Sequence, residues 1–149
     1  DQMLREHPDC DLHLVHPMFE DADYGELEKF ATFSVFVDGK PQEVTALRLE
    51  SQLNGLRRVW YILDHELFHR SKKQPYPPAM TKLSSLRYFS LWNQSVAKLI
   101  ELIRPDAYHC MDYHAALANL YLKKEDQIPV VLVLHNADYM GIIETDFIN

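Results

Sequence analysis

The sequence predicts an α/β fold in which an early β-hairpin precedes alternating helices and parallel strands. Three observations predict it. Asp38-Gly39 separates two runs rich in β-forming residues, which is a hairpin signal. Apolar residues then recur at helical spacing between residues 81 and 104. Residues 129–134 form a continuous apolar run of the kind that parallel sheets bury on both faces.

The first half of the chain is predicted to consist of strands joined by turns. Pro17 ends the first apolar run, and the acidic stretch over residues 20–28 is expected to be a solvated loop or helical turn. Gly55 supplies a turn before the last strand of this half. The expected strands cover residues 12–15, 33–37, 44–49 and 59–63.

A long helix is predicted to open the second half. Prolines at positions 75, 77 and 78 break any helix before it. Thr81 can cap the helix, and Pro105 marks its end, so the helix should run to about Arg104.

The remaining residues are predicted to form strand, helix and strand. Residues 107–110 form a short buried strand, and residues 129–134 form the second one. A right-handed crossover between them is the default topology. The helix between them should run from Tyr113 to about Lys124. Its inward-facing residues are expected to be Ala116, Leu117, Leu120 and Tyr121.

Composition excludes several classes of protein. The 149 residues, 47% of them apolar, fit about one globular domain. The formal net charge of −7 argues against a nucleic-acid binder. Four scattered glycines exclude a glycine-rich phosphate loop within this stretch, and two cysteines favour a reducing compartment. There is no membrane-spanning run and no signal peptide, and the missing initial Met suggests a processed product or a piece of a longer chain.

Two polar residues follow the expected parallel strands. Asp112 and His135 each stand near the carboxyl end of a strand, where open α/β sheets bind ligands. Asp112 could instead cap the next helix, and the two roles can coexist. His135 could be a hydrogen-bonded interior residue. His114, in the first turn of that helix, could bind a ligand or only pack there.

A second pattern suggests zinc. His65, Glu66 and His69 match H-E-x-x-H, which on a helix binds zinc and supplies a general base. The pattern directly follows a strand and precedes prolines, so the supporting helix would be too short. A grouping of His109, Cys110 and His114 is better explained as strand packing, because adjacent strand residues point to opposite faces. No metal is therefore predicted.

Two linked motifs carry a resemblance to a known family. Residues 105–117, PDAYHCMDYHAAL, resemble the P-D-x-x-H-x-x-D-W-H-x-A/G-L pattern of glycogen and starch synthases, with Tyr113 in place of Trp. Residues 135–141, HNADYMG, resemble the family's H-N-x-x-Y-Q-G, with Met140 in place of Gln. Residues 112–114, D-Y-H, have the form that is typical of fungal-type α-1,3-glucan synthases. Further resemblance to that branch of the family is found at residues 74–77, 83–85 and 92–94. The likeness covers about residues 58 to 143.

The resemblance implies a Rossmann-like N-terminal lobe of a two-lobed (GT-B) glycosyltransferase. Such an enzyme transfers glucose from a nucleotide sugar, UDP-glucose or ADP-glucose, to a growing α-glucan with retention of configuration. No metal or further cofactor is implied. The family places the H-E-x-x-H segment at a strand-end turn, which speaks against zinc. The residues carried over are Asp112 and His135 as catalytic residues, with His114, Asn136, Tyr139 and Gly141 as substrate-binding residues.

The departures from the family define the expected domain. The family's K-x-G-G-L donor loop and its second lobe are not found in this sequence. Residues 1–149 are therefore expected to be part of an acceptor-side lobe, inactive alone, whose partner is the remainder of the polypeptide. The expected location is the cytoplasmic side, as an intracellular domain of a plasma-membrane protein. The alternatives are a non-catalytic glucan-binding or scaffold lobe, and a zinc hydrolase that uses His65, Glu66 and His69.

Overall fold

The computed structural model describes residues 10–53, 56–70 and 81–135. The chain divides into two compact units. Unit 1 consists of residues 1–33 and 43–78, and unit 2 consists of residues 34–42 and 79–149. No helix in the described residues is long and apolar enough to cross a membrane.

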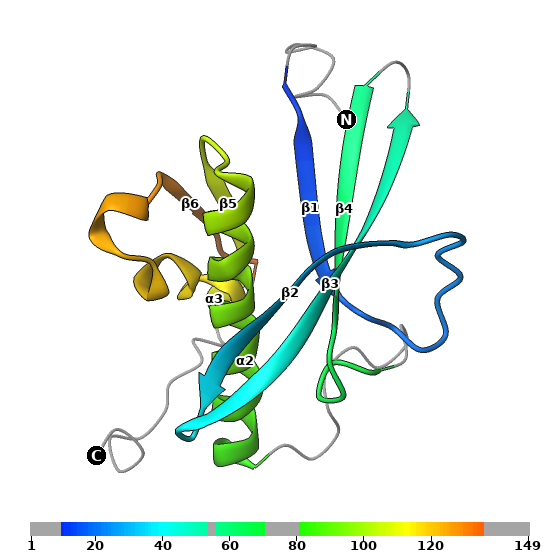
Figure 1. Cartoon of the computed structure of the whole chain (residues 1–149). Coiled ribbons are helices and arrows are strands. Elements are labelled where there is room, and N and C mark those ends of the chain that lie inside the picture. Colours follow the sequence, from blue (N-terminus) through cyan, green and yellow to red (C-terminus); the bar gives the residue numbers. More distant parts are fainter. Residues whose placement is uncertain (1–9, 54–55, 71–80, 136–149) are drawn as a thin grey trace. The chain divides into compact units, whose positions relative to one another are not determined.

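The described part of the first half forms a four-stranded sheet (Figure 1). Its strands are β1 (Leu12–Pro17), β2 (Glu28–Val37), β3 (Lys40–Leu53) and β4 (Leu56–Asp64). Their order is β1-β4-β3-β2, with β1 parallel and β3 antiparallel to β4. All four predicted strands are confirmed, and each is longer than predicted, β2 and β3 by the largest margins. The predicted turn at Gly55 lies outside the described residues.

The predicted hairpin turn between β2 and β3 is confirmed. Asp38 and Gly39 have φ values of 51° and 69°, and a two-residue type I′ turn requires positive φ at both positions. The hairpin tip is held within unit 2 by Gln94 of the next helix. The Gln94 side chain donates to the carbonyl of Phe36 at 2.7 Å and accepts from its N–H at 3.2 Å.

The core of unit 1 lies in the centre of the sheet. The buried residues lie on both faces of the central strand β4, since Ile62 and Leu63 are adjacent and point to opposite sides of the sheet. The fully buried apolar residues in the described part of this unit are Val44, Ala46, Val59, Ile62, Leu63 and Phe68.

The long predicted helix is confirmed as α2 (Lys82–Ile103). The Thr81 Oγ1 accepts from the N–H of Ser84 at 3.1 Å, which satisfies one of the free donors of the first turn. Arg104 ends the helix at φ 53°, and its N–H donates to the carbonyl of Ile100 at 2.8 Å. Both ends match the prediction.

The predicted parallel strand pair is confirmed, but the predicted burial of the second strand on both faces is wrong. β5 (Tyr108–Met111) runs parallel to β6 (Val130–Val133). In the described residues these two strands form a sheet of their own, and α2 packs mainly on the segment between them. Val131, Leu132 and Leu134 therefore stay exposed, Leu134 by 67%.

The predicted helix over residues 113–124 is also wrong. Three short turns replace it: α3 (Asp112–Ala115), and the 3₁₀ turns η1 (Ala118–Tyr121) and η2 (Lys124–Asp126). A side chain takes an amide hydrogen that a continuous helix would use, since the Leu117 N–H donates to Asn93 Oδ1 at 3.0 Å. Beyond the predicted helix, the Ile128 N–H donates to Asn119 Oδ1 at 3.2 Å.

The break also changes which residues face inward. Of the four predicted to be buried, Leu117, Leu120 and Tyr121 are exposed, and Ala116 is half-buried. Ala118 and Leu122 are buried instead. A 3₁₀ turn has three residues per turn rather than 3.6, so the spacing expected for an α-helix points to the wrong residues.

Candidate functional site

The carboxyl ends of β5 and β6 bring Asp112 and His135 together. Met111 pairs with Val133 in the parallel register, so the residues that follow each strand meet at one edge of the sheet. The N–H of His135 donates to Asp112 Oδ1 at 2.7 Å. The predicted placement of both residues near the carboxyl ends of parallel strands is confirmed, and the structure shows that they are bonded.

Asp112 does not act as the helix cap. The N-cap of α3 is Met111, which makes no side-chain capping bond, and Asp112 is already the first helical residue. Asp112 has φ 54°, in the left-handed region that Asp tolerates better than most residues. Its carboxylate binds the backbone of the other strand end instead of the first turn of its own helix.

The His135 ring lies at the surface. The alternative that His135 is an interior histidine is wrong, because this residue is exposed. The ring Nε2 lies 3.4 Å from the Sδ of Met111, a weak acceptor. The backbone of His135 is thus fixed by Asp112, while its imidazole remains accessible to a ligand.

His114 lies half-buried on α3. Its ring contacts the rings of Tyr113 and Phe89, with centroids 3.9 and 4.9 Å away. Burial lowers the pKa of His114, and the charge of Asp112 partly opposes this shift. A neutral imidazole can both donate and accept a hydrogen bond, which suits a sugar hydroxyl. The other predicted substrate-binding residues, Asn136, Tyr139 and Gly141, lie outside the described residues.

The zinc interpretation of H-E-x-x-H is wrong because its helix does not form. Residues 65–69 form a turn after β4. His65 Nδ1 accepts from the N–H of Leu67 at 3.1 Å, and His69 Nε2 lies 2.6 Å from Asp64 Oδ1. The two imidazoles are therefore held by separate local partners. The described residues contain no group of three or more side chains that could hold a metal ion.

The grouping of His109 and Cys110 resolves as predicted. His109 is exposed, whereas Cys110 is 1% exposed. The two side chains point to opposite faces of β5, as adjacent strand residues do.

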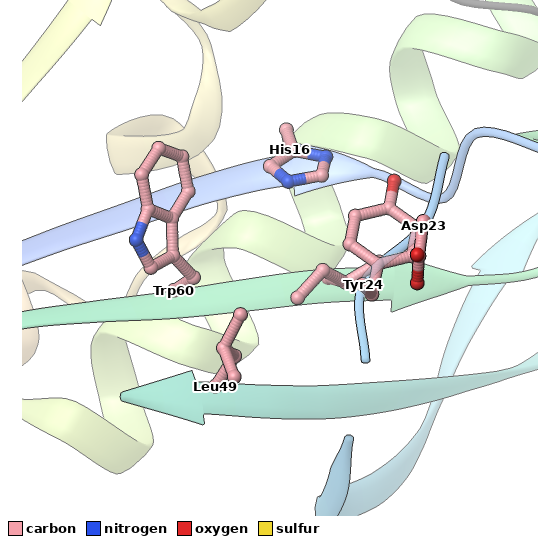
Figure 2. Close-up of a pocket in the computed structure, with 6 residues that line it drawn as sticks. His16, Asp23, Tyr24, Leu49 and Trp60 are labelled. Atoms are coloured by element: carbon pink, nitrogen blue, oxygen red, sulfur yellow. The ribbon is translucent and has the colours of Figure 1, made fainter. Parts of the chain in front are cut away.

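Unit 1 contains a separate pocket of about 220 Å³ (Figure 2). Figure 2 shows His16 on β1, Leu49 on β3 and Trp60 on β4. Tyr24 comes from the loop after β1, and its ring stacks on that of His16 at 5.7 Å. The remaining lining residues are Asp23 and Ile62.

The polar groups of this pocket are largely used locally. His16 Nδ1 lies 2.7 Å from the carbonyl of Pro17, and Trp60 donates to the Ser51 hydroxyl at 3.3 Å. Asp23 Oδ1 accepts from the N–H of Gly25 at 3.0 Å, and the Tyr24 hydroxyl accepts from the Phe19 N–H at 3.0 Å. The rings of His16, Tyr24 and Trp60 pack the loop after β1 against the sheet, which is a structural role.

Sequence reasoning assigned no role in the site to Asn93, which it quoted only within residues 92–94 for their likeness to α-1,3-glucan synthases. Asn93 is 1% exposed on α2, and its side chain bonds to the α3 turn. Its signal in the sequence is a polar residue on the apolar stripe of a helix, four residues after Phe89 and three before Val96. A buried amide must find hydrogen-bond partners, and here those partners belong to the candidate site.

Comparisons with known proteins identify the family. A family model for the starch synthase catalytic domain matches residues 4–149. Two Schizosaccharomyces pombe proteins, cell wall alpha-1,3-glucan synthases mok13 and ags1, are 39% and 36% identical to the chain over 89% of its length. A glycogen synthase of Desulfitobacterium hafniense is 25% identical over 89% of the chain. The chain spans only 5% of each fission-yeast relative and 29% of the bacterial one.

A solved structure confirms the fold. The chain resembles the catalytic domain of starch synthase IV from Arabidopsis thaliana with a TM-score of 0.61 and 20% identity. The match covers 87% of this chain and 27% of that one. The predicted α/β fold class and the predicted family resemblance are both confirmed. The chain belongs to the starch synthase catalytic domain family.

Proposed function

We propose that this chain is part of a retaining glucosyltransferase that extends an α-glucan with glucose from a nucleotide sugar. The observation that carries the proposal is the hydrogen bond of 2.7 Å between Asp112 and the backbone of His135. It builds a carboxylate and an accessible imidazole into one edge of the β5–β6 pair, where α/β sheets bind ligands.

The relatives support the substrate classes. The similar starch synthase IV domain was solved bound to ADP and acarbose, and the fission-yeast relatives are cell wall alpha-1,3-glucan synthases. We therefore propose UDP-glucose or ADP-glucose as the donor and an α-glucan as the acceptor, with no metal or other cofactor. A location on the cytoplasmic side, as an intracellular domain of a membrane protein, is part of this proposal.

The chemistry of glucosyl transfer suits these side chains. Transfer with retention passes through a transition state with positive charge on the sugar ring, as in glycoside hydrolysis. The Asp112 carboxylate would lower the energy of that charge, because an anion held in place needs no reorganisation during the step. The exposed His135 imidazole and the half-buried His114 would bind hydroxyls of the sugar. Asn136, Tyr139 and Gly141 are proposed to complete the substrate-binding set.

The domain assignment follows from the same argument. We propose that residues 1–149 form part of the acceptor-side lobe and that a second lobe of the same polypeptide supplies most of the donor site. The two lobes would close on the nucleotide sugar, so the complete polypeptide is the protein to assay.

The test measures glucosyl transfer by the complete polypeptide that contains this chain. Labelled UDP-glucose and ADP-glucose are offered in turn with an α-glucan primer. Replacing Asp112 by Asn should lower kcat/KM by about 10²- to 10³-fold, the usual loss when a group that stabilises the transition state is removed. His135→Ala should also lower kcat/KM, because it removes a proposed ligand of the sugar hydroxyls. Asp106→Asn is the matched control for Asp112→Asn, since Asp106 is an exposed carboxylate before β5.

Two outcomes would contradict the proposal. Full transfer activity in both His135→Ala and Asp112→Asn would remove these residues from the site. Glucan binding by the unmodified polypeptide without transfer from either donor would instead support a non-catalytic glucan-binding lobe.

A further inference from the structure

We propose that Asn93 is a positioning residue that holds the turn carrying Asp112 and His114 in its working geometry. The inference rests on the proposed function. Asn93 lies on α2, 19 residues before Asp112 in the sequence; it belongs to residues 92–94, which resemble the α-1,3-glucan synthases, but to neither of the two motifs that supply the site residues.

The Asn93 side chain makes three hydrogen bonds. Its Nδ2 donates to the carbonyl of Phe89 on the same helix at 2.8 Å and to the carbonyl of His114 at 2.9 Å. Its Oδ1 accepts from the N–H of Leu117 at 3.0 Å. Both amide hydrogens and the acceptor are thus used. At 1% exposure, water offers no replacement for these partners.

The two bonds to the turn replace the helical ladder where that ladder stops. In a continuous helix the Leu117 N–H would donate to the carbonyl of Tyr113, and the His114 carbonyl would accept from the chain four residues on. Here α3 ends at Ala115. Asn93 therefore satisfies one donor and one acceptor that the break of the helix leaves free.

The Asn93 clamp and the Asp112–His135 bond hold opposite ends of one short turn. Asp112 begins α3 in the left-handed conformation, and its carboxylate accepts from His135. His114 lies two residues later, with its carbonyl on Asn93. A four-residue helix has little stability of its own, so its position depends on these contacts. Loss of the clamp should move Asp112 and His114 without removing either side chain.

The experiment replaces Asn93 in the complete polypeptide. Asn93→Ala removes all three bonds. Asn93→Asp keeps an acceptor for Leu117 but removes both donors. Ser95→Ala is the matched control, because Ser95 is also fully buried on α2 and bonds only to the carbonyl of Leu91 on the same helix, at 2.7 Å.

Kinetics provide the first readout. Both Asn93 variants should lower kcat for glucosyl transfer by about 10- to 100-fold, the scale expected for catalytic groups misplaced by about 1 Å. KM for the donor should change less than kcat, because the second lobe would supply most of the donor contacts. Ser95→Ala should stay within about two-fold of the unmodified protein. If both Asn93 variants match Ser95→Ala in kcat, the inference is overturned.

Hydrogen exchange provides a readout that does not depend on activity. The Leu117 amide should exchange at least about ten-fold faster in Asn93→Ala, and near its original rate in Ser95→Ala, where its acceptor remains. Unchanged Leu117 exchange in Asn93→Ala would overturn the positioning role even if the enzyme assay failed. Absence of transfer by the unmodified protein, with the exchange result as expected, would instead overturn the proposed function. If Asn93→Ala does not fold, the kcat of Asn93→Asp decides the question.

Discussion

The bond between Asp112 and the His135 backbone can be tested by three substitutions at position 112. Asn retains a neutral acceptor, Ala removes the acceptor, and Gly removes the acceptor while fitting the left-handed backbone. A hydrogen bond to a charged group contributes about 1.5–3 kcal/mol, and a neutral one about 0.5–1.5 kcal/mol. At about 1.4 kcal/mol for each factor of ten, Asp112→Ala should accelerate exchange of the His135 amide by roughly 10- to 100-fold. Asp112→Asn should accelerate it by only about five-fold.

The comparison of Ala with Gly isolates the cost of the backbone conformation. Asp112 has φ 54°, which costs a residue with a Cβ atom about 1–2 kcal/mol and costs Gly little. Both variants lose the bond to His135, so their His135 amides should exchange alike. The Ala116 amide, which donates to the carbonyl of Tyr113 at 3.3 Å, should exchange roughly five-fold more slowly in Asp112→Gly than in Asp112→Ala.

The assay is amide hydrogen exchange of the complete polypeptide, read at residues 112–117 and 130–135. Asp106→Asn serves as the control for loss of one negative charge near β5. If Asp112→Ala leaves the His135 amide unchanged, the bond does not hold the end of β6, and the reasoning about this site is refuted. Comparison of the same variants in glucosyl transfer separates geometry from charge. Asp112→Asn keeps most of the geometry and loses the charge.

Three further perturbations test the framework around the site. Burial lowers the pKa of His16 below the ordinary histidine value of 6.5, and the bond to the Pro17 carbonyl partly opposes this shift. The unfolded chain therefore binds the proton more readily than the folded one. The stability that this difference contributes is complete above about pH 6.5 and decreases as the pH falls towards the folded-state pKa. His16→Phe should therefore reduce the loss of melting temperature between pH 7.5 and 5.5. An unchanged pH dependence of the melting temperature would contradict the assignment. Gly39→Ala should lower the free energy of unfolding by about 1 kcal/mol, because its φ of 69° is unfavourable for a residue with a Cβ atom. No clash adds to this cost, since the added Cβ would meet nothing within 4 Å. An undiminished melting temperature would show that the turn relaxes. Thr81→Ala should cost about 1 kcal/mol and Thr81→Ser much less, measured by exchange of the first-turn amides of α2; equal losses would argue against the cap.

The elements that the sequence predicted well are those determined by local chemistry. The hairpin follows from Asp38-Gly39, whose residue types tolerate the positive φ of a type I′ turn. The start of α2 follows from the Thr81 hydroxyl. Each depends on residues within a few positions of one another, so a single sequence contains the relevant information.

The prediction for the region between β5 and β6 failed because the residue that bonds to its backbone is distant in the sequence. The apolar spacing of residues 113–124 fits an α-helix, yet Asn93 supplies Leu117 with an acceptor from 24 residues away. That bond gives the Leu117 N–H an acceptor without the bonds of a continuous helix. Three of the residues predicted to be buried are therefore exposed, and Ala118 and Leu122 are buried instead. The exposure of β6 has a similar origin, since a run of apolar residues predicts burial only where other elements cover the strand.

The two conclusions about Asp112, proximity to His135 and capping of the helix, had different foundations. Proximity depends only on the register of two parallel strands, because residues that follow paired strand ends must meet at one edge. Capping depends on the backbone conformation of Asp112, and φ 54° turns its side chain away from the first turn of α3 and towards the N–H of His135. The same left-handed residue therefore explains why the capping prediction failed and why the two residues are bonded rather than merely close. A site residue at a strand end is placed by topology, but its hydrogen-bond partner is chosen by one backbone angle that residue type alone does not determine.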